Sequence, residues 1–288
     1  MALISNKEML RRAHDGHYAV GAFNLNNLEW TEYILRAAQD MKSPVIVEVS
    51  EAQIEYMCGY QTVRGMVESM MDYLGITVPV ALHLDHGSFE GAKRAIEEGY
   101  TSVMFDGSHY RFAENIEKSK QIIELAHARG ISVECEVGGI GGTEDGKTSG
   151  GELADPEECA AIAALGVDSL AAGIGNIHGK YPADWKGLNF ERLAEIQSST
   201  NAIPLVLHGG SGIPADQIKK AVSLGVSKIN VNTECGIAFS DALKEYYGKK
   251  KEEEPKGYDP RVIMSYGMDA VYRMVCGKIQ LFGSRDKA

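Results

Sequence analysis

Short, continuous apolar runs recur along the chain, and amphipathic stretches separate them. A continuous run, rather than an alternating one, is typical of a parallel strand that is covered on both faces. Eight such runs predict strands at Tyr18–Phe23, Val45–Ser50, Val80–Asp85, Ser102–Asp106, Ser132–Val137, Ser169–Ile174, Leu205–His208 and Lys228–Asn232. The stretches between them predict helices, among them Phe89–Glu98, Ala113–Arg129, Pro156–Leu165, Phe190–Ser199 and Pro214–Leu224.

Eight β/α units in a chain of 288 residues favour an α/β fold of the (β/α)8 (TIM) barrel type over an open doubly wound sheet. A doubly wound sheet usually begins with a glycine-rich nucleotide-binding turn, which the segment Gly21–Asn26 does not provide. We expect one domain over residues 1–288, with an extra N-terminal helix and a C-terminal helical extension. Ser5 and Glu8 form a capping-box pattern for the first helix. The charged segment 248–257 is expected to be a connector to a last helix, Pro260–Phe282.

Composition narrows the class of protein. A formal net charge of -11 makes nucleic acids and anionic membranes poor partners. No run of about 18 apolar residues is present to span a membrane. The five cysteines are widely spaced and the N-terminus lacks a secretion-signal pattern, so we expect a cytoplasmic protein. An anionic ligand would need local positive charge from a metal ion, backbone N–H groups or single Arg and Lys side chains.

Polar side chains end nearly every predicted strand. Three of them are His86, His178 and His208, each at or just past a strand end. The C-terminal ends of barrel strands meet at one face, so we expect these histidines to converge. Three imidazoles that leave a coordination position open suit zinc or a similar divalent ion. The other strand-end groups are Asn24, Ser50, Asp85, Asp106, Glu136, Asn230 and Asn232.

The segment His83–Gly87 places a carboxylate beside one of these candidate ligands. Successive strand residues point to opposite sides, so Asp85 and His86 can serve one site only if the strand turns, which Gly87 permits. Asp85 is then a candidate proton donor and acceptor. His83, on the same face as Asp85, is expected to be structural or to support the site.

Two carboxylates flank Cys135 on the fifth predicted strand. Glu134 and Glu136 share a face that should point into the barrel or its mouth. A buried carboxylate is costly without a partner, so a metal ion, a lysine or a shared proton is implied. We expect Glu136, nearer the rim, to be an alternative metal ligand and Glu134 to pair internally.

Two glycine-rich segments follow predicted strands. Gly209–Pro214 comes after the seventh strand, where barrels commonly bind phosphate through backbone N–H groups; a plain tight turn is the alternative. Ser211, Asn230 and Thr233 could add hydrogen bonds from their side chains. Gly138–Gly151 contains seven glycines and follows Glu136. It could be a flexible loop, but we favour a closing lid that carries Glu144 or Asp145.

Together these motifs resemble the class II, metal-dependent fructose-bisphosphate aldolases, a family shared with the tagatose-bisphosphate aldolases. The resemblance covers essentially the whole chain, and the order of eight motifs makes it specific. The motifs are Tyr18–Asn24, His83–Gly87, Phe105–His109, Val133–Gly138, Gly175–Gly179, Leu207–Gly212, Ile229–Glu234 and Tyr258–Arg261.

The resemblance implies an activity: reversible cleavage of fructose 1,6-bisphosphate to dihydroxyacetone phosphate and glyceraldehyde 3-phosphate, in glycolysis and gluconeogenesis. A catalytic Zn²⁺ would stabilise the enediolate as a Lewis acid. The residues that match its three ligands are His86, His178 and His208, and those that match an alternative or second metal position are Asp106 and Glu136. Asp85 matches the acid/base at the C4 oxygen, and Glu144 matches a mobile-loop residue that exchanges a proton with dihydroxyacetone phosphate.

The resemblance also implies a phosphate site and an oligomer. The residues that match the family's phosphate-binding group, which a monovalent cation (Na⁺ or K⁺) often assists, are Gly179, Gly209, Ser211, Asn230 and Thr233. Further candidates for substrate contact are Asn24, Ser50, Gly210 and Asn232. Arg261 matches an arginine that reaches the far phosphate from a neighbouring subunit, so a homodimer or homotetramer is expected.

Two positions depart from the family pattern. Fructose-type members often have Asp, and tagatose-type members Ala, where this chain has Asn232, which can still bond a sugar hydroxyl. Fructose 1,6-bisphosphate is therefore favoured, with tagatose 1,6-bisphosphate as the alternative. Some members carry a phosphate-binding lysine a few residues beyond the His-Gly step. Here Lys180 follows that step at once, and its role is left open.

Three other mechanisms or classes fit less well. A Schiff-base aldolase needs a strand lysine at the mouth, and only Lys228 lies in a predicted strand, at its N-terminal end. A metal-dependent hydrolase barrel would usually show His-x-His on the first strand, which here ends in Phe23-Asn24. A non-catalytic phosphosugar-binding protein would have no use for Asp85 and Glu144.

Overall fold

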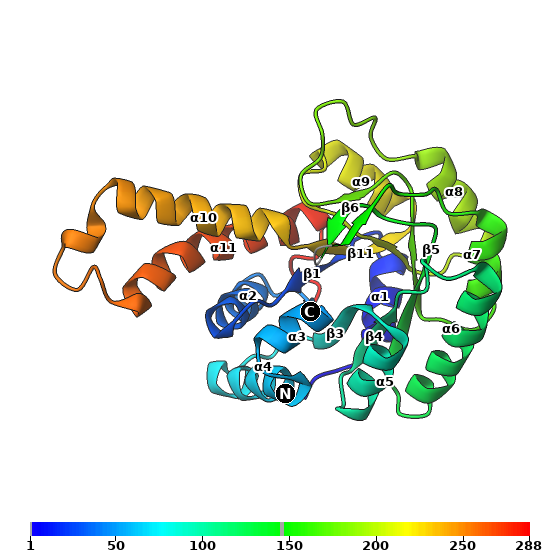
Figure 1. The fold of residues 1–288 in the computed structure, drawn as a ribbon, viewed down its shortest axis with the longest axis horizontal. Helices are drawn as coiled ribbons and strands as arrows, with labels where there is room; N and C mark the ends of the chain where they lie inside the picture. Colours follow the sequence, from blue (N-terminus) through cyan, green and yellow to red (C-terminus); the bar gives the residue numbers. More distant parts are fainter. Residues whose placement is uncertain (1, 145–146) are drawn as a thin grey trace.

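The computed structural model describes residues 2–144 and 147–288, and a closed barrel of parallel strands lies at its centre (Figure 1). Around the barrel the strands follow the order β1-β11-β10-β8-β5-β4-β3-β2. Each pair of neighbours is parallel. The predicted (β/α)8 fold is therefore confirmed. The barrel strands are β1 (Val20–Asn24), β2 (Val45–Val49), β3 (Val80–Gly87), β4 (Ser102–Phe105), β5 (Ser132–Val137), β8 (Ser169–Ala172), β10 (Leu205–Leu207) and β11 (Val226–Val231).

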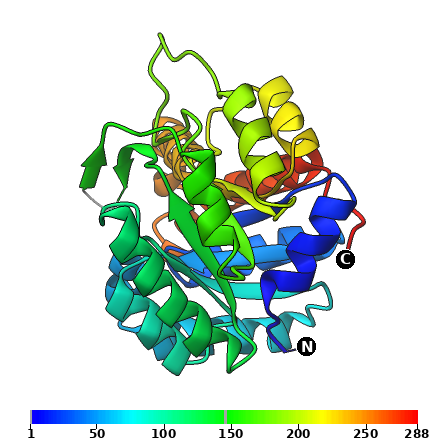
Figure 2. The ribbon, with the colours of Figure 1, turned by 90° about the vertical axis from the view of Figure 1, so that its right-hand side faces the viewer.

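Helices surround the strands, as the view in Figure 2 shows from a second side. Strand side chains such as Phe23, Leu82 and Val103 belong to one large apolar core with the helices. This explains why the strands read as continuous apolar runs. The surrounding helices are α2 (Leu28–Asp40), α3 (Glu51–Tyr56), α4 (Tyr60–Leu74), α5 (Phe89–Glu97), α6 (Phe112–His127), α7 (Pro156–Ala163), α8 (Phe190–Ser199) and α9 (Ala215–Ser223). Among the described residues, no helix is both long and apolar enough to cross a membrane.

The extra N-terminal helix, α1 (Asn6–Asp15), closes the N-terminal end of the barrel. Its Leu10 packs in a separate buried cluster with Val20 and Ile46 of the strands. The N-cap is as predicted, because the Ser5 hydroxyl accepts a hydrogen bond from a backbone N–H of the first turn. The reciprocal half of the capping box is not formed: the Glu8 carboxylate instead accepts hydrogen bonds from the arginines one turn further along.

The C-terminal extension is a pair of helices. α10 (Thr233–Gly248) and α11 (Pro260–Phe282) pack side by side and project from the barrel (Figure 1). The bounds predicted for the last helix match those of α11. The charged connector contains a short 3-10 helix, Lys251–Glu253. α10 was not predicted.

The glycine-rich segment expected to form a lid contains a β-hairpin. β6 (Gly141–Glu144) pairs antiparallel with β7 (Lys147–Ser149) and parallel with the two-residue strand β9 (Ile177–His178). Gly142 lies opposite His178 with φ +90, and a Cβ there would overlap the His178 carbonyl oxygen. The hairpin base is thus anchored to the strand that carries His178. The Glu144 side chain and Asp145 lie outside the described part of the chain.

Candidate active site and metal centre

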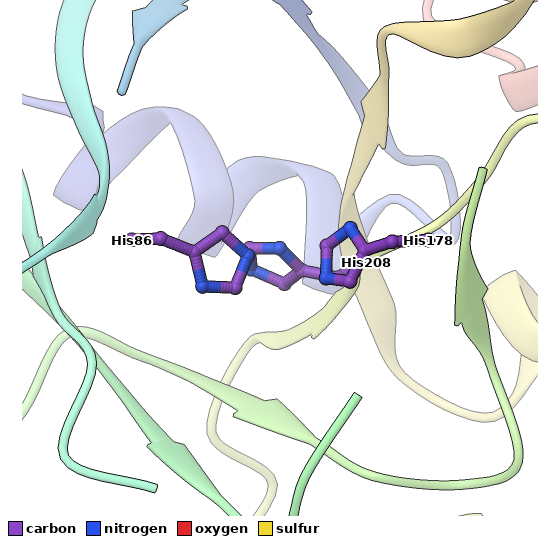
Figure 3. Close-up of side chains that lie close together, drawn as sticks. All are labelled: His86, His178 and His208. Atoms are coloured by element: carbon purple, nitrogen blue, oxygen red, sulfur yellow. The ribbon is translucent and has the colours of Figure 1, made fainter. Parts of the chain in front are cut away.

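Three histidines converge at the C-terminal mouth of the barrel (Figure 3). His86 lies at the end of β3, His178 at the end of β9 and His208 directly after β10. One ring nitrogen from each lies within 4.8 Å of those of the other two. The ring centroids of His86 are 4.5 Å from those of His208 and 4.9 Å from those of His178. The structure thus brings together the three side chains that were predicted to bind a metal ion.

A bulge in β3 turns His86 toward this cluster. The register of β3 against β4 shifts between Leu84 and Gly87, and His86 has φ +45, which non-glycine residues rarely adopt. The predicted turn is therefore present, but His86 itself takes the left-handed conformation. Gly87 is needed for a different reason: a Cβ there would lie 2.6 Å from the Met104 carbonyl oxygen. Asp85 and His86 can consequently serve the same site.

Carboxylates hydrogen-bond to the rings of His86 and His208. His86 Nδ1 lies 2.9 Å from Asp106 Oδ2, and His208 Nε2 lies 2.9 Å from Glu134 Oε1. The remaining nitrogens, His86 Nε2 and His208 Nδ1, are buried without a hydrogen-bond partner among the described residues. Buried polar atoms are rarely left unpaired. His86 and His208 each have one unpaired nitrogen and one nitrogen bonded to a carboxylate. This combination is typical of histidines that bind a divalent metal ion.

The protonation states of two candidate ligands, His208 and His86, also bear on whether a metal ion fits here. Burial and the neighbouring His86 lower the pKa of His208 well below its ordinary value, which keeps the ring neutral as a metal ligand must be. Burial opposes protonation of His86 too, but the Asp106 hydrogen bond and nearby carboxylates raise its pKa well above normal. A metal ion bound at His86 would therefore displace a proton.

A second set of donors shares His86. Ligand atoms of His86, Asp106 and Glu136 all lie within 4.8 Å of one another. Glu136 Oε2 lies 4.0 Å from His86 Nδ1 and is buried without a hydrogen-bond partner among the described residues. Burial and the charge of Asp106 raise the pKa of Glu136 well above its usual value. These groups match the composition of the predicted alternative metal position.

Asp85 lies buried beside the histidines. Its Oδ2 accepts a hydrogen bond from Asn24 Nδ2 at 3.0 Å, and its Oδ1 accepts one from Asn230 Nδ2 at 3.1 Å. Burial alone would raise the pKa of Asp85, but the charges of His86 and Lys228 and the Asn24 hydrogen bond lower it below the usual value. The carboxylate is thus held ionised at the mouth, where it can accept a proton.

A pocket opens next to Asp85 at the start of α10. The Ser211 hydroxyl accepts a hydrogen bond from the Glu234 N–H in the first turn of that helix. A helix N-terminus and glycine backbone both offer N–H groups to an anion. Gly210, predicted as a contact, donates its N–H to the Asn230 carbonyl next to the pocket. The pocket is lined by Asn24, Asp85, His178, Gly179, His208, Gly209, Ser211, Asn230, Asn232 and Thr233.

Two predicted site residues lie elsewhere. The Ser50 hydroxyl caps α3 in a full capping box with Gln53, so local helix chemistry accounts for it. Gln53, which was not predicted, also accepts a hydrogen bond from Asn24 Nδ2 at 3.3 Å. The Arg261 side chain is 91% exposed near the start of α11 and pairs with Asp259 on the projecting helices. Neither Ser50 nor Arg261 lines the pocket.

The interior of the barrel holds a buried ion-pair cluster that was only partly predicted. Lys228 was expected at the N-terminal end of its strand, but β11 begins at Val226, so Lys228 lies within the strand; it is fully buried with Nζ 2.9 Å from Glu134 Oε2. The prediction that Glu134 pairs internally is confirmed. The sequence analysis did not predict a role for Glu48, although a glutamate within the apolar run Val45–Val49 indicated a buried carboxylate that needs a partner. Burial and the charge of Asp85 raise the pKa of Glu48 well above normal.

Tyr181 was also missed. Its hydroxyl donates to the Gly209 carbonyl at 2.8 Å and accepts from the Ile177 N–H at 3.0 Å. It therefore ties the glycine-rich loop after β10 to β9. Trp185 packs against its ring and donates to the Gly175 carbonyl. The aromatic pair fixes the loop that follows β8.

A closed parallel barrel with a histidine cluster, a carboxylate and an anion-type pocket at the C-terminal ends of its strands defines an enzyme of the (β/α)8 class. Comparison with known proteins refines this class. The family model described as "Fructose-bisphosphate aldolase class-II" matches residues 4–287, and the chain belongs to that family.

Relatives and solved structures agree with the family. A fructose-bisphosphate aldolase of Mycoplasma pneumoniae is 54% identical over 288 residues, which cover 99% of this chain and all of the relative. One from Streptococcus pneumoniae is 49% identical, with complete coverage of both chains. The crystal structure of the YdjI aldolase from Escherichia coli K12 superposes with a TM-score of 0.84 at 34% identity, over the full length of both chains.

The predicted resemblance and the predicted class of enzyme are therefore confirmed. The chain is a class II fructose-bisphosphate aldolase by family, which makes it a carbon–carbon lyase that acts on a phosphosugar. Membership of class II also implies a divalent metal ion, and the unpaired histidine nitrogens fit one.

Proposed function

We propose that the enzyme reversibly cleaves fructose 1,6-bisphosphate to dihydroxyacetone phosphate and glyceraldehyde 3-phosphate, with Zn²⁺ bound by His86, His178 and His208. The observation that carries this proposal is the pair of buried, unpaired imidazole nitrogens in the histidine cluster, directly beside Asp85. The names of relatives at 49% and 54% identity support the substrate. The alternative metal position would be formed by His86, Asp106 and Glu136.

The protein groups around the cluster have distinct roles in this proposal. Bound zinc supplies a Lewis acid for the negative charge that develops on the substrate. Asp85 takes the proton from the C4 hydroxyl during cleavage and returns it during condensation, while Asn24 and Asn230 hold its two oxygens in place. Glu144, on the hairpin, exchanges a proton with dihydroxyacetone phosphate.

One phosphate of the substrate binds in the pocket at the start of α10. Backbone N–H groups there provide positive potential in a protein whose net charge is -11. A monovalent cation, Na⁺ or K⁺, assists at the same place. The proposed contacts are Gly179, Gly209, Ser211 and Thr233. The Gly210 N–H is already bonded to the Asn230 carbonyl, and the two Asn230 Nδ2 hydrogens to Glu48 and Asp85, so these two predicted contacts have no donor left for the phosphate.

The second phosphate requires another copy of the chain. Arg261 is exposed on helices that project away from its own barrel (Figure 1), so we propose that it reaches the site of a neighbouring subunit in a homodimer or homotetramer. The cysteines of the described residues are all free, which suits the reducing cytoplasm as the working compartment.

The preference between sugar epimers is assigned to Asn232. It lines the pocket and can donate a hydrogen bond to a sugar hydroxyl, which favours fructose over tagatose 1,6-bisphosphate. The ratio of kcat/KM for the two epimers tests this choice. A higher value for tagatose 1,6-bisphosphate would reverse the assignment.

The decisive experiment is an assay of fructose 1,6-bisphosphate cleavage before and after treatment with EDTA, followed by addition of zinc. We expect activity to disappear and then return. Activity that survives complete metal removal would contradict the proposal. Binding of zinc and phosphosugar without any cleavage would instead identify a non-catalytic binding protein.

A further inference from the structure

A buried lysine, Lys228, lies beneath the proposed metal site, inside the barrel. Lys228 Nζ is 2.9 Å from Glu134 Oε2, 3.5 Å from Glu48 Oε2 and 3.3 Å from His83 Nε2. All four side chains are buried. The ammonium group donates hydrogen bonds to Glu134 and His83, and it forms a longer ion pair with Glu48.

From Lys228 one chain of contacts leads to a proposed metal ligand. The second oxygen of Glu134, Oε1, accepts a hydrogen bond from His208 Nε2 at 2.9 Å. A neutral imidazole that donates from Nε2 keeps its lone pair on Nδ1. His208 Nδ1 is the buried atom without a hydrogen-bond partner in the histidine cluster. The bond to Glu134 therefore selects the tautomer that presents the correct nitrogen.

A second chain leads from Lys228 to the proposed proton carrier. Glu48 Oε2 accepts a hydrogen bond from Asn230 Nδ2 at 3.1 Å, and the same Nδ2 donates to Asp85 Oδ1 at 3.1 Å. An amide NH₂ group has two hydrogens, so both are used. Asn230 is thus held between two carboxyl groups, and its orientation toward Asp85 depends on Glu48.

The third contact of Lys228 braces the cluster. His83 Nε2 accepts from the ammonium group, so His83 Nδ1 carries the hydrogen and donates to Ser102 Oγ at 2.7 Å. Burial and the charge of Lys228 lower the pKa of His83 well below normal, which agrees with a neutral ring. His83, predicted to be structural or supporting, connects Lys228 to β4.

We propose that Lys228 is a positioning residue for both halves of the active site: through Glu134 it orients His208, and through Glu48 and Asn230 it orients Asp85. The inference rests on the roles proposed above for His208 and Asp85, and it deepens them. Lys228 lies between two chains of contacts, here called branches: one runs through Glu134 to His208, the other through Glu48 and Asn230 to Asp85. A mutation within one branch should affect that branch alone, whereas loss of the lysine should affect both.

The test uses full-length, zinc-loaded protein and separates the two branches. In Glu134→Gln the amide oxygen is drawn to the Lys228 ammonium group, so the NH₂ group faces His208 Nε2, donor against donor, and His208 loses its acceptor. We expect zinc affinity, measured by competition with a chelator, to fall about 10- to 100-fold. Glu48→Ala removes the acceptor of Asn230; we expect kcat to fall about 10- to 100-fold, with unchanged zinc affinity and KM. Glu48→Gln keeps an acceptor oxygen and should restore kcat.

Asp168→Asn is the matched control, because Asp168 is also a buried carboxylate that pairs with a lysine and a histidine, but at the opposite end of the barrel. It should change neither zinc affinity nor kcat. Lys228→Met should lower both quantities, and thermal unfolding of every variant identifies those that fail to fold. If Glu134→Gln and Glu48→Ala alter the same quantity, or neither, or if Glu48→Gln fails to restore kcat, the inference is wrong. A wild-type enzyme without zinc-dependent cleavage would overturn the proposed function itself.

Discussion

Both ends of the barrel bury an aspartate near a histidine and a lysine, yet the two groups differ in what they leave unpaired. At the N-terminal end, Asp168 accepts hydrogen bonds from His127 Nε2 at 2.8 Å and from the Val133 N–H at 2.9 Å, and it pairs with Lys7 at 2.9 Å. At the mouth, Asp85 is equally well held, but the imidazole nitrogens beside it, His86 Nε2 and His208 Nδ1, have no partner among the described residues.

The difference separates a stabilising cluster from a binding site. Unpaired buried polar atoms and a left-handed His86 each cost free energy, and a fold retains such features where a ligand or a reaction uses them. The presence of Asp, His and Lys together is therefore a poor guide to function. What distinguishes the two groups is the unsatisfied bonding capacity of the histidines at the mouth.

The largest expected effect comes from removing a proposed metal ligand at the mouth. His208→Ala should lower kcat/KM about a thousandfold or more, because several kcal/mol of metal-derived transition-state stabilisation are lost. Zinc content by mass spectrometry should fall with it. His127→Ala, at the other end, is the control and should retain both activity and zinc. A zinc-loaded His208→Ala enzyme with normal activity would remove the distinction between the two ends.

Next in size is the loss of the proposed proton carrier. Asp85→Asn should lower kcat by about 10²- to 10⁴-fold, the usual contribution of a positioned acid/base. Zinc content should stay at the wild-type level, because Asp85 is not a proposed ligand. Steady-state kinetics and metal analysis of the same preparation check both points. Loss of zinc in parallel with activity would show that Asp85 helps to hold the metal.

The N-terminal cluster should respond in stability rather than in activity. Asp168→Ala leaves the buried Val133 N–H without its acceptor, so the free energy of unfolding should fall by about 2 kcal/mol. Urea unfolding measures this change, and kcat per folded enzyme should be unaltered. A change in kcat at 25 °C without a change in stability would contradict the structural role assigned to this end.

The smallest effect concerns α1, which closes the N-terminal end. Hydrogen bonds from Arg11 and then Arg12 lower the pKa of Glu8 to about 2. A carboxyl group whose pKa is lower in the folded state stabilises above its unfolded pKa, and this contribution disappears as the pH falls toward 2. Glu8→Gln should therefore lower the midpoint of thermal unfolding slightly at pH 7 and progressively less in acid. An equal difference at every pH would exclude this ion-pair contribution.

Most of the barrel could be predicted because a parallel strand covered by helices has to be apolar on its outer face. The strand ends likewise indicated the pocket: apart from Gly179, which the family resemblance supplied, the residues that line it had been predicted from a strand end or the loop that follows. Ser50 shows where that rule fails, since a residue at a strand end can also be the N-cap of the next helix. Local capping then takes the hydroxyl away from the site.

The interior cluster was harder to predict. A run such as Val45–Val49 shows that a strand is buried, but it does not show whether Glu48 points into the barrel or toward a helix. The partners of Lys228 come from β2, β3 and β5, which only the closure of the barrel brings together. Short backbone pairings, such as that of β6 with β9, leave almost no periodic pattern to detect.

The pairing of β6 with β9 has a consequence for protein engineering. Gly142 and His178 lie opposite each other in one small sheet, so the base of the hairpin and one proposed metal ligand are held together by backbone pairing. Loop grafting usually treats such a hairpin as an exchangeable module whose tips alone matter. In this barrel a graft that changes the hairpin register also shifts the side chain of a proposed ligand, and new loops have to be selected together with β9.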